Sequence, residues 1–329
     1  MSFARMLTIA ALVPAWAGLL VVSTWGPAAN AQTYPAKSIR FILPFAAGSA
    51  VDVLARVYAQ NMSELWKQQV LVDNRTGANG IIGTELAARA APDGYTVYFG
   101  NIATLSINPH LYAKLPYDVS RDFAPVSLIG AINSCLVIHP SLPVRSVKEL
   151  IAFAKARPGQ LNYASGGVGS AQHIPMEMFK QMTGTSIMHV VYKGLTPAFN
   201  DVVAGQVPMI VSGVVTALPM HETGRLRILA TTAPKRTAAT PDIPTVAESG
   251  VPGYDWDSWV GVLVPTGTSQ DIIARLNAEI VRVTRLPQTH SRLPGFTWIG
   301  STPQEYGDFV KSNTDRIGKV IKAAAIKAE

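Results

Sequence analysis

Apolar and polar positions along the chain alternate between two patterns, short strand-like runs and longer stretches with helical spacing. The stretch 38–45, SIRFILPF, is a nearly continuous apolar run that is typical of a buried strand, and 51–66 carries apolar residues at helical spacing. Further strands are predicted over 70–74 and 95–100, with a helix over 83–88 between them. Strands that alternate with helices at this spacing predict an α/β fold with a mostly parallel sheet.

The second half of the chain repeats this alternation and predicts another α/β unit. Strand-like runs stand at 135–140, 161–166, 188–194, 207–213, 226–232 and 259–265. Amphipathic helices are predicted at 146–159, 171–184, 196–206 and 269–284, with a further one at the C-terminus. No low-complexity linker separates the two units, so we expect two domains joined by crossing strands.

The N-terminal stretch predicts a secretory signal peptide over residues 1–31. Arg5 is its only charge, the stretch 6–25 is almost wholly apolar, and the tripeptide ANA is a small-x-small cleavage site. A retained membrane anchor is the alternative, since the apolar stretch could span a bilayer, but Pro14 interrupts it. We therefore expect cleavage after Ala31 and a soluble periplasmic protein.

Composition supports two folded domains and argues against several functions. With 329 residues, 48% apolar and 15% charged, the chain is too large for one ordinary core and too apolar to be disordered. The net charge of +7 comes from scattered Lys and Arg without interleaved aromatics, so we expect no nucleic-acid partner. Cys135 is the only cysteine, which excludes an intrachain disulfide and, in an apolar strand, predicts a small buried side chain.

Two strand–loop–helix units contain small residues where a ligand could bind. One reads FILPF-AAGSA-VDVLAR and begins at Phe41; the other reads LNYA-SGGVGS-AQHIPMEMF and begins at Leu161. Each would bring a helix N-terminus to the carboxyl edge of a parallel sheet, where unpaired first-turn N–H groups and the helix dipole favour an anion. Ser49, Ser165 and Ser170 add hydroxyl donors. If the loops face each other from different domains, they predict a carboxylate site; otherwise both are only tight turns.

Signatures of catalysis or metal binding are weak. The glycines match neither a P-loop nor a clean G-x-G-x-x-G, and no G-x-S-x-G is present. Ser170, His173 and Asp201 could form a hydrolase triad, although such a combination is common by chance. The histidines, at positions 110, 139, 173, 189, 221 and 290, lack metal-ligand spacing and are expected to be surface or capping residues. We therefore expect a protein that is not an enzyme and needs no metal or cofactor.

The segment YDWDSW combines aromatic and acidic residues. Asp255 and Asp257 flank Trp256. Paired carboxylates can exchange protons with a substrate, but in a segment rich in Gly and Pro they more often cap a turn. The aromatic side chains could line a cleft or fill a core. Of Tyr254, Trp256 and Trp259, we expect two in the core and one in a cleft.

A series of collinear motifs resembles the extracytoplasmic solute-binding proteins of tripartite tricarboxylate transporters, the Bug family. The motifs run from Tyr34 to the C-terminus and read YPAKSIRFILPFAAGSAVDVLAR, VLVDNRTGANGIIGTELAARAAPDGYT, INPHLYAKLPYD, RDFAPVSLIG, SVKELIAFAKARPGQLNYASGGVGSAQHIPMEMFK, HVVYKG, DIPTVAESGVPGYD and GSTPQEY. The resemblance implies a type II periplasmic-binding-protein fold, in which two α/β domains enclose a ligand cleft. It also implies capture of a small organic carboxylate, often a di- or tricarboxylate or an amino acid, and delivery to a two-component membrane permease of the TctA/TctB kind.

With that fold, we expect domain I to comprise residues 32–131 and 256–329, and domain II to comprise residues 132–255. The protein is expected to act as a monomer. Two other functions stay open. A sensory adaptor would use the same cleft and dock on a membrane sensor instead of a permease. A secreted serine hydrolase would use Ser170 and His173.

The resemblance also implies which residues bind the ligand. The family's cleft uses the first βα loop, here Pro44–Asp52, and the Gly/Ser loop of the second domain, here Ser165–Ser170. Its contacts are largely backbone N–H groups and bridging waters, which agrees with an anion site at two helix starts. The ligand-binding residues expected in this chain are Phe45, Ala46, Ala47, Gly48, Ser49, Asp52, Asn101, Ser165, Gly167, Gly169, Ser170, His173 and Ser212.

Two departures from the family pattern bear on the ligand. The first loop usually reads PFPAGGGTD and here reads PFAAGSAVD, so Val51 stands where a Thr hydroxyl could donate. After GQV the family often has a polar or acidic pair, and here Ser212 and Gly213 stand there. An acidic group at that point could bind a ligand amine. Its absence favours a purely anionic or partly aromatic acid over an amino acid.

Overall fold

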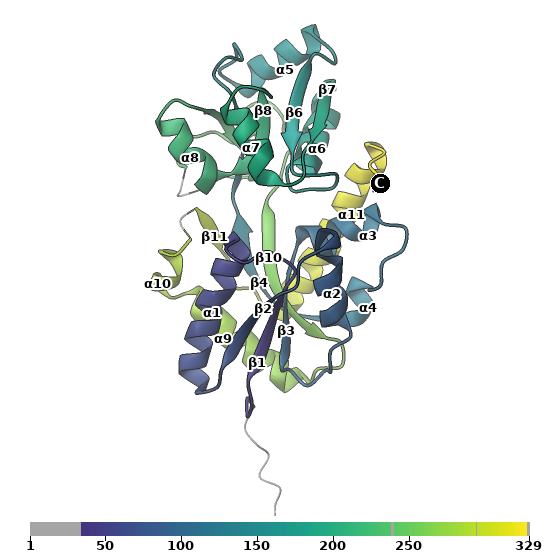
Figure 1. Cartoon of the computed structure of the whole chain (residues 1–329), viewed down its shortest axis with the longest axis vertical. Coiled ribbons are helices and arrows are strands. Elements are labelled where there is room, and N and C mark those ends of the chain that lie inside the picture. The colour runs from purple at the N-terminus through teal and green to yellow at the C-terminus, as the bar shows by residue number, and fades with distance from the viewer. Residues whose placement is uncertain (1–33, 238–239, 294, 328–329) are drawn as a thin grey trace, which may run out of the picture. The chain divides into compact units, whose positions relative to one another are not determined.

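The computed structural model describes residues 34–237, 240–293 and 295–327 (Figure 1). The predicted signal peptide and its cleavage site lie outside the described residues. Within those residues, no helix combines the length and the apolarity that a membrane span requires. The described residues hold two separate β-sheets, and helices pack against both.

The first sheet and its helices form a unit that we call the first lobe. Its strands are β1 (Ile39–Leu43), β2 (Val70–Asn74), β3 (Thr96–Asn101), β4 (Phe123–Ile132), β10 (Ser258–Pro265) and β11 (Phe296–Trp298). They lie in the order β11-β4-β10-β3-β1-β2. The helical elements are α1 (Ala50–Trp66), η1 (Ala78–Gly80), α2 (Ile81–Ala88), η2 (Ala103–Ile107), α3 (Asn108–Leu111), α4 (Val119–Asp122), α9 (Gln270–Thr284), α10 (Pro287–His290) and α11 (Pro303–Ala323).

The second sheet and its helices form the second lobe. Its strands are β5 (Ser134–Ile138), β6 (Leu161–Ser165), β7 (Ile187–Val191), β8 (Met209–Gly213) and β9 (Arg227–Thr231), and they lie in the order β7-β6-β8-β5-β9. The helices of this lobe are α5 (Val147–Ala156), α6 (His173–Thr183), α7 (Leu195–Val203) and α8 (Val214–Glu222). Each predicted strand and helix of this half is found, with ends that differ by a few residues.

The sheets are mixed, so the prediction of a mostly parallel sheet is wrong. β1 pairs with β2 and β3 in parallel, and β6 pairs with β7 and β8 in parallel. β10 runs antiparallel to β3 and β4, and β5 runs antiparallel to β8 and β9. The reason is the path of the chain: β4, β5 and β10 adjoin the crossings between the lobes, and they enter each sheet against the direction of its strand–helix–strand units.

The chain crosses between the lobes twice. The first crossing is Asn133 alone, between β4 and β5. The second is the segment 255–257, which leads into β10; the residue before it still contacts the second lobe, since Tyr254 OH donates to Pro175 O at 3.0 Å. Thr232 of the second lobe links the two crossings: its N–H donates to the O of Ser134, the residue after Asn133, and its O accepts a hydrogen bond from Trp256 N–H, each at 2.9 Å. The exact limits of the two domains stay a prediction, which this allocation of strands supports.

The hydropathy pattern does not predict β4, although this strand is ten residues long. Pro125 interrupts its apolar run, and a proline argues against a central strand because it cannot donate to the ladder. In the structure the pairing of β4 with β10 shifts register between Pro125 and Ser127. A bulge at this point tolerates the missing N–H, so the proline marks an irregularity inside a strand rather than its end.

Aromatic side chains near the second crossing are buried in the core. Tyr254, Trp256 and Trp259 are 2%, 0% and 2% exposed, and Trp259 also lines a hollow of about 420 Å³. Trp259 Nε1 donates to Asn313 Oδ1 of α11 at 3.2 Å, which gives the indole N–H a partner inside the core and lets the ring be buried completely. Cys135 is buried, as predicted.

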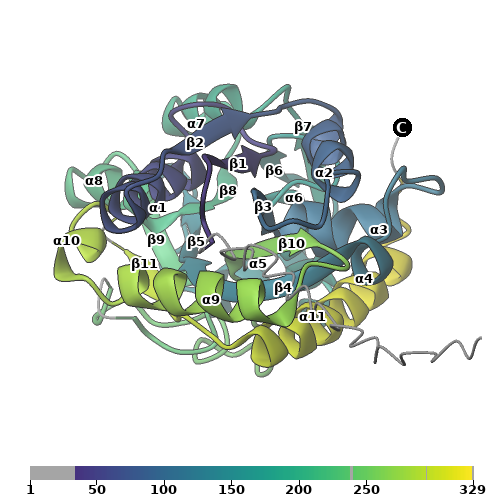
Figure 2. The ribbon, with the colours of Figure 1, turned by 90° about the horizontal axis from the view of Figure 1, so that it is seen from below.

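The C-terminal helices reinforce the middle of the first sheet. Both α9 and α11 pack against β4, with β10 beside it (Figure 2). Each helix begins at a side-chain cap. Ser269 Oγ accepts a hydrogen bond from Ile272 N–H, and Thr302 and Glu305 form a reciprocal capping box. The helix predicted over 269–284 is thus confirmed, with its start fixed by the serine.

Gly261→Ala should destabilise the first lobe. Gly261 lies on β10, and a Cβ there would overlap the ring of Tyr306, which is fully buried. The ring cannot move aside without disturbing the core, so we expect the free energy of unfolding to fall by about 1–3 kcal/mol. Urea unfolding followed by circular dichroism measures the change. Gly213→Ala is the matched control, since its nearest neighbour, Ile132 Cγ2, stands at 4.0 Å. An equal loss in both variants would contradict the steric explanation.

Candidate functional site

The first loop joins β1 to α1 at the carboxyl edge of the first sheet. Its predicted site residues are exposed or half-buried: Phe45, Ala46, Ala47, Gly48 and Ser49. Ser49 caps α1, because its Oγ accepts a hydrogen bond from Asp52 N–H at 3.2 Å. The N–H groups of Ala46 and Ala47 have no acceptor among the residues that the structure describes. They lie beside the start of a helix of 17 residues, where its dipole is positive.

Asp52 braces this loop from the first turn of α1. Its carboxylate is 2% exposed and accepts hydrogen bonds from Gly48 N–H, Arg56 Nε and Asn74 Nδ2, each at 2.9 Å. Burial opposes ionisation, but these donors outweigh it and hold the pKa of Asp52 below its usual value. Asn74 also donates to Phe45 O at 3.0 Å. The N–H of Gly48 is therefore hydrogen-bonded within the loop and is not free for a ligand.

The second loop joins β6 to α6 and is closed by its own hydrogen bonds. Ser165 Oγ lies 3.1 Å from Gly167 O and 3.2 Å from Gly167 N. Ser170 N–H donates to Gly167 O at 3.2 Å, and Gly169 N–H donates to His173 Nδ1 at 3.0 Å. Gly167 and Gly169 have φ angles of +140° and +72°, which residues with a Cβ rarely adopt. The loop thus has one defined shape, in which both of these glycine amides are used internally.

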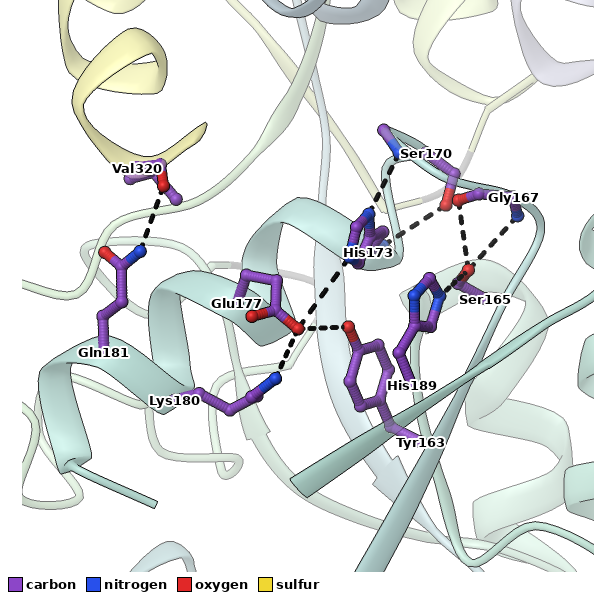
Figure 3. A network of polar contacts seen from close by, with 11 residues as sticks. Tyr163, Ser165, Gly167, Ser170, His173, Glu177, Lys180, Gln181, His189 and Val320 are labelled. Carbon is purple, nitrogen blue, oxygen red and sulfur yellow. Dashed lines mark hydrogen bonds and ion pairs between the residues drawn. The ribbon is translucent and has the colours of Figure 1, made fainter. Parts of the chain in front are cut away.

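A buried polar network stands behind the second loop (Figure 3). The rings of His173 and His189 stack with their centroids 4.0 Å apart, and His189 stacks on Tyr163 at 4.8 Å. Glu177 Oε1 accepts hydrogen bonds at 2.6 Å from Tyr163 OH and Lys180 Nζ. Burial, and then the neighbouring imidazole, lowers the pKa of His173 to about 4, and burial lowers the pKa of His189. Both imidazoles are therefore neutral at pH 7.

The expectation that the histidines are surface or capping residues is wrong for His173, which is buried, while His189 is half-buried. His173 is 6% exposed. His189 Nε2 lies 2.5 Å from Ser165 Oγ, and Ser165 itself is fully buried. The reason is the aromatic stack with Tyr163, which covers the apolar faces of both imidazoles and leaves their nitrogens to polar partners. Sequence spacing cannot reveal such a stack, because its rings come from two strands and a helix.

The residues of the suggested hydrolase triad do not assemble. His173 Nδ1 accepts a backbone N–H, and its Nε2 faces Glu177 Oε1 at 3.8 Å. Ser170 Oγ accepts a hydrogen bond from the backbone N–H of His173 at 3.3 Å and does not reach the ring. Asp201 accepts a hydrogen bond from Tyr192 OH at 2.7 Å. This arrangement gives the Ser170 hydroxyl no general base.

Asn101 and Ser212 stand at the same sheet edges as the two loops. Asn101 ends β3, which runs parallel to β1, and its Oδ1 accepts a hydrogen bond from Thr104 N–H at 3.1 Å. Ser212 lies near the end of β8, which runs parallel to β6, and it is 1% exposed. Its hydroxyl has no hydrogen-bond partner within the described residues. Burying a hydroxyl without a hydrogen-bond partner costs folding free energy. The Ser212 hydroxyl therefore stands near the second loop as a polar group that a ligand could satisfy.

The two loops belong to different lobes, and the second loop touches the first lobe. A Cβ on Gly169 would overlap Leu111 of α3. Asn108 of α3 exchanges hydrogen bonds with Asn79 of η1, at 2.8 and 3.0 Å. A Cβ on the last residue of η1 would stand 3.1 Å from Pro44 Cβ, at the start of the first loop. A continuous set of contacts therefore joins the two loops.

Four hollows in the described surface lie away from these loops. Three of them measure about 750, 810 and 870 Å³, and one of about 420 Å³ lies beside the second crossing, where Asp255, Asp257 and Arg316 line it. Arg316 Nη1 pairs with Asp255 Oδ2 at 3.2 Å. Asp257 Oδ1 is buried without a partner among the described residues, and burial, then the charge of Asp255, raises the pKa of Asp257 to about 8. Asp257 is therefore largely a neutral acid at pH 7 and not a turn cap.

Sequence reasoning missed the side chains that hold the two loops. Arg56 and Asn74 hold the first loop, and each left a signal: Arg56 follows Asp52 at i,i+4 spacing, and Asn74 ends the strand paired with β1. Glu177 and Lys180 support the second loop from α6. Tyr163 left no signal, because its contact depends on the register that sets it opposite a histidine of β7.

Comparison with known proteins defines the class of this chain. The model of the tripartite tricarboxylate transporter family receptor matches residues 54–326, and the chain belongs to this family. Protein BugT of Bordetella pertussis is 34% identical over 330 residues, which cover 99% of each chain. A solved structure from R. palustris with adipate is 35% identical, with a TM-score of 0.80, and the match covers 90% of this chain and 100% of that one.

MatC from Rhodopseudomonas palustris, with bound malate, is similar as well, at 28% identity and a TM-score of 0.76 over 88% of this chain and 100% of that one. The predicted family is confirmed, and so is the predicted periplasmic-binding-protein fold with two α/β domains. The chain is a solute-binding protein of the Bug kind, from a family of receptors rather than of enzymes.

The buried acid at the second crossing should make stability depend on pH. The folded pKa of Asp257, about 8, lies above the ordinary value of 3.8, so the folded chain holds a proton that the unfolded chain releases. This stabilisation is complete below pH 3.8 and is lost as the pH rises towards 8. The neutral histidines behind the second loop act in the opposite direction below about pH 6.5, so the free energy of unfolding should decline between about pH 6.5 and about pH 8 in the wild type, as urea titrations at both pH values would show.

Asp257→Asn stays neutral at every pH and should remove most of that decline. Asp242→Asn, which changes an exposed aspartate of the same size, is the control and should leave the decline in place. A decline of equal size in wild type and Asp257→Asn would show that other groups cause it.

Proposed function

We propose that the chain captures a small di- or tricarboxylate, or an aromatic acid, between the two loops and delivers it to a membrane permease. The receptor family supports this role. The relatives solved with adipate and with malate support a carboxylate as the ligand. The proposed binding residues are those expected from the sequence, with Val168 added, and we divide them between direct contact and support.

The proposal rests on a pair of loops, one on each lobe. Neither loop directs a charged side chain towards the proposed ligand, and only some of the loop N–H groups are hydrogen-bonded within the described residues. The N–H groups of Ala46 and Ala47 in the first loop, and of Val168 in the second, have no acceptor in the part of the chain that the structure describes. Both loops lead into helix N-termini, whose dipoles favour a negative charge. We assign direct contacts to these amides and a supporting role to the glycines.

The groups near the second loop favour an acid without an amine. Ser212 contributes a hydroxyl that has no partner among the described residues. A hydroxyl can donate to a carboxylate but cannot neutralise an ammonium group. The net charge of +7 over the chain also favours the approach of anions.

We further propose that the chain is exported through a signal peptide cleaved after Ala31, and that it works in the periplasm as a monomer. Delivery would be to a two-component permease of the TctA/TctB kind. The match to a receptor family of tripartite transporters supports the transport role.

Calorimetric titration of the purified protein with adipate, malate and benzoate tests the proposal. We expect saturable binding of at least one of these acids. Gly169→Ala should weaken that binding by about tenfold or more, because a Cβ there overlaps Leu111 and disturbs the loop at a cost comparable to a lost hydrogen bond.

Gly184→Ala is the matched control for this variant. Gly184 also has a positive φ, of +64°, but a Cβ there meets nothing within 4 Å. It lies at the far end of α6, so the control carries the same backbone strain without touching the loop. Failure of the wild-type protein to bind any small carboxylate, or an equal loss in both variants, would contradict the proposed site.

A further inference from the structure

Two stacked histidines each hold one glycine of the second loop. His173 does so directly, since its Nδ1 accepts the hydrogen bond from Gly169 N–H at 3.0 Å. His189 does so through Ser165, whose Oγ lies 2.5 Å from His189 Nε2 and also bonds the backbone of Gly167. The two rings are nearly parallel, at 13°, and Figure 3 shows them side by side behind the loop.

The hydrogen bond to Gly169 requires a neutral imidazole. A ring nitrogen accepts a hydrogen bond only while its lone pair is free, so Nδ1 must be unprotonated and the ring proton must sit on Nε2. That Nε2 faces Glu177 Oε1 at 3.8 Å. Lys180 Nζ lies 2.6 Å from Glu177 Oε1 and balances its negative charge, so Glu177 does little to stabilise a protonated His173 ring.

The groups that face the two stacked imidazole rings influence whether the rings are protonated. They are Tyr163 and Ser165 from β6, Glu177 and Lys180 from α6, and His189 from β7. Burial and the second imidazole disfavour a charge on His173, and Lys180 adds to this effect while Glu177 opposes it. The surroundings therefore select the one protonation state in which the ring can hold the loop.

We propose that His173 is a positioning residue, which as a neutral acceptor for Gly169 N–H fixes the shape of the second loop that ligand binding requires. The inference rests on the proposed function and goes further, because it removes the His173 side chain from the ligand contacts and gives it a defined chemical task. The ligand then meets the neighbouring amides and not the imidazole.

A merely space-filling role is the alternative, and two variants separate it from the proposal. Asn places its Oδ1 two bonds from Cβ, as His places its Nδ1, so His173→Asn keeps an acceptor for Gly169 N–H and does not titrate. His173→Leu fills a similar volume with apolar atoms and leaves that buried N–H without a partner. If the ring only fills space, Leu is the better substitute; if it is an acceptor, Asn is.

The test measures the affinity of each variant at pH 7.5 for adipate and malate, the two acids used as probes. His173→Leu should weaken binding by about tenfold or more, the cost of an unsatisfied buried donor, while His173→Asn should stay within about threefold of wild type. His139→Asn, at a half-buried histidine of the same lobe away from the loop, is the control and should leave affinity unchanged. Better binding by His173→Leu than by His173→Asn would overturn the proposal.

The pH profile gives a second readout that does not need the Leu variant to fold. The pKa of His173 lies at about 4 in the closed network against an ordinary 6.5. As the pH falls from 6.5 towards 4, protonation should therefore favour the released loop and weaken binding. His173→Asn lacks this proton and should decline less steeply. Protonation of the probe acid is common to both proteins and cancels in the ratio of their dissociation constants. Identical ratios at every pH would contradict the inference.

Hydrogen exchange of the Gly169 amide, measured by NMR without any ligand, separates this inference from the proposed function. The amide should be protected in wild type and His173→Asn and should exchange at least about tenfold faster in His173→Leu. If no probe acid binds but this order of protection is found, the proposed function fails and the positioning role stands. If the acids bind but protection does not depend on the acceptor, the positioning role fails alone.

Discussion

A hydrogen bond from a loop glycine to a buried acceptor is the interaction on which the proposed site depends. In the first loop the Asp52 carboxylate takes the N–H of Gly48, and in the second the His173 imidazole takes the N–H of Gly169. Each acceptor stands in the helix that follows its loop. Each bond fixes a glycine at a positive φ and so decides which neighbouring amides point outward. Without these acceptors the loops would be flexible chains of small residues, and ordering them around a ligand would cost conformational entropy.

The two acceptors achieve the same result by different electrostatics. Asp52 is held ionised by its donors, whereas His173 is held neutral by burial and by a second imidazole. Neither places a full positive charge beside the proposed site. We expect a site of this kind to distinguish acids by the position and direction of its donors rather than by net charge.

Strands and helices with a clear local periodicity are predicted from the sequence, whereas features that depend on the pairing of strands are not. The strand at 38–45, the helix after it and the helix over 269–284 carry their periodicity within a few turns, and all are found. The two loops are recognisable because small residues follow buried strands. The strand β4 is not predicted, because Pro125 is compatible with it only through a bulge opposite β10. The imidazole stack is not predicted either, since it depends on Tyr163 lying opposite His189 in the register of two strands that are separated by a helix.

The crossing at Asn133 has a mechanical consequence. This residue is held from both sides: its Oδ1 accepts a hydrogen bond from Thr297 Oγ1 of the first lobe, and its backbone O accepts one from Val214 N–H of the second, each at 2.9 Å. A connection one residue long offers two backbone torsions and no slack. The short connection therefore fixes the distance between the lobes at this point. Any rotation of one lobe against the other would have to be centred near Asn133, and the second crossing would have to bend with it.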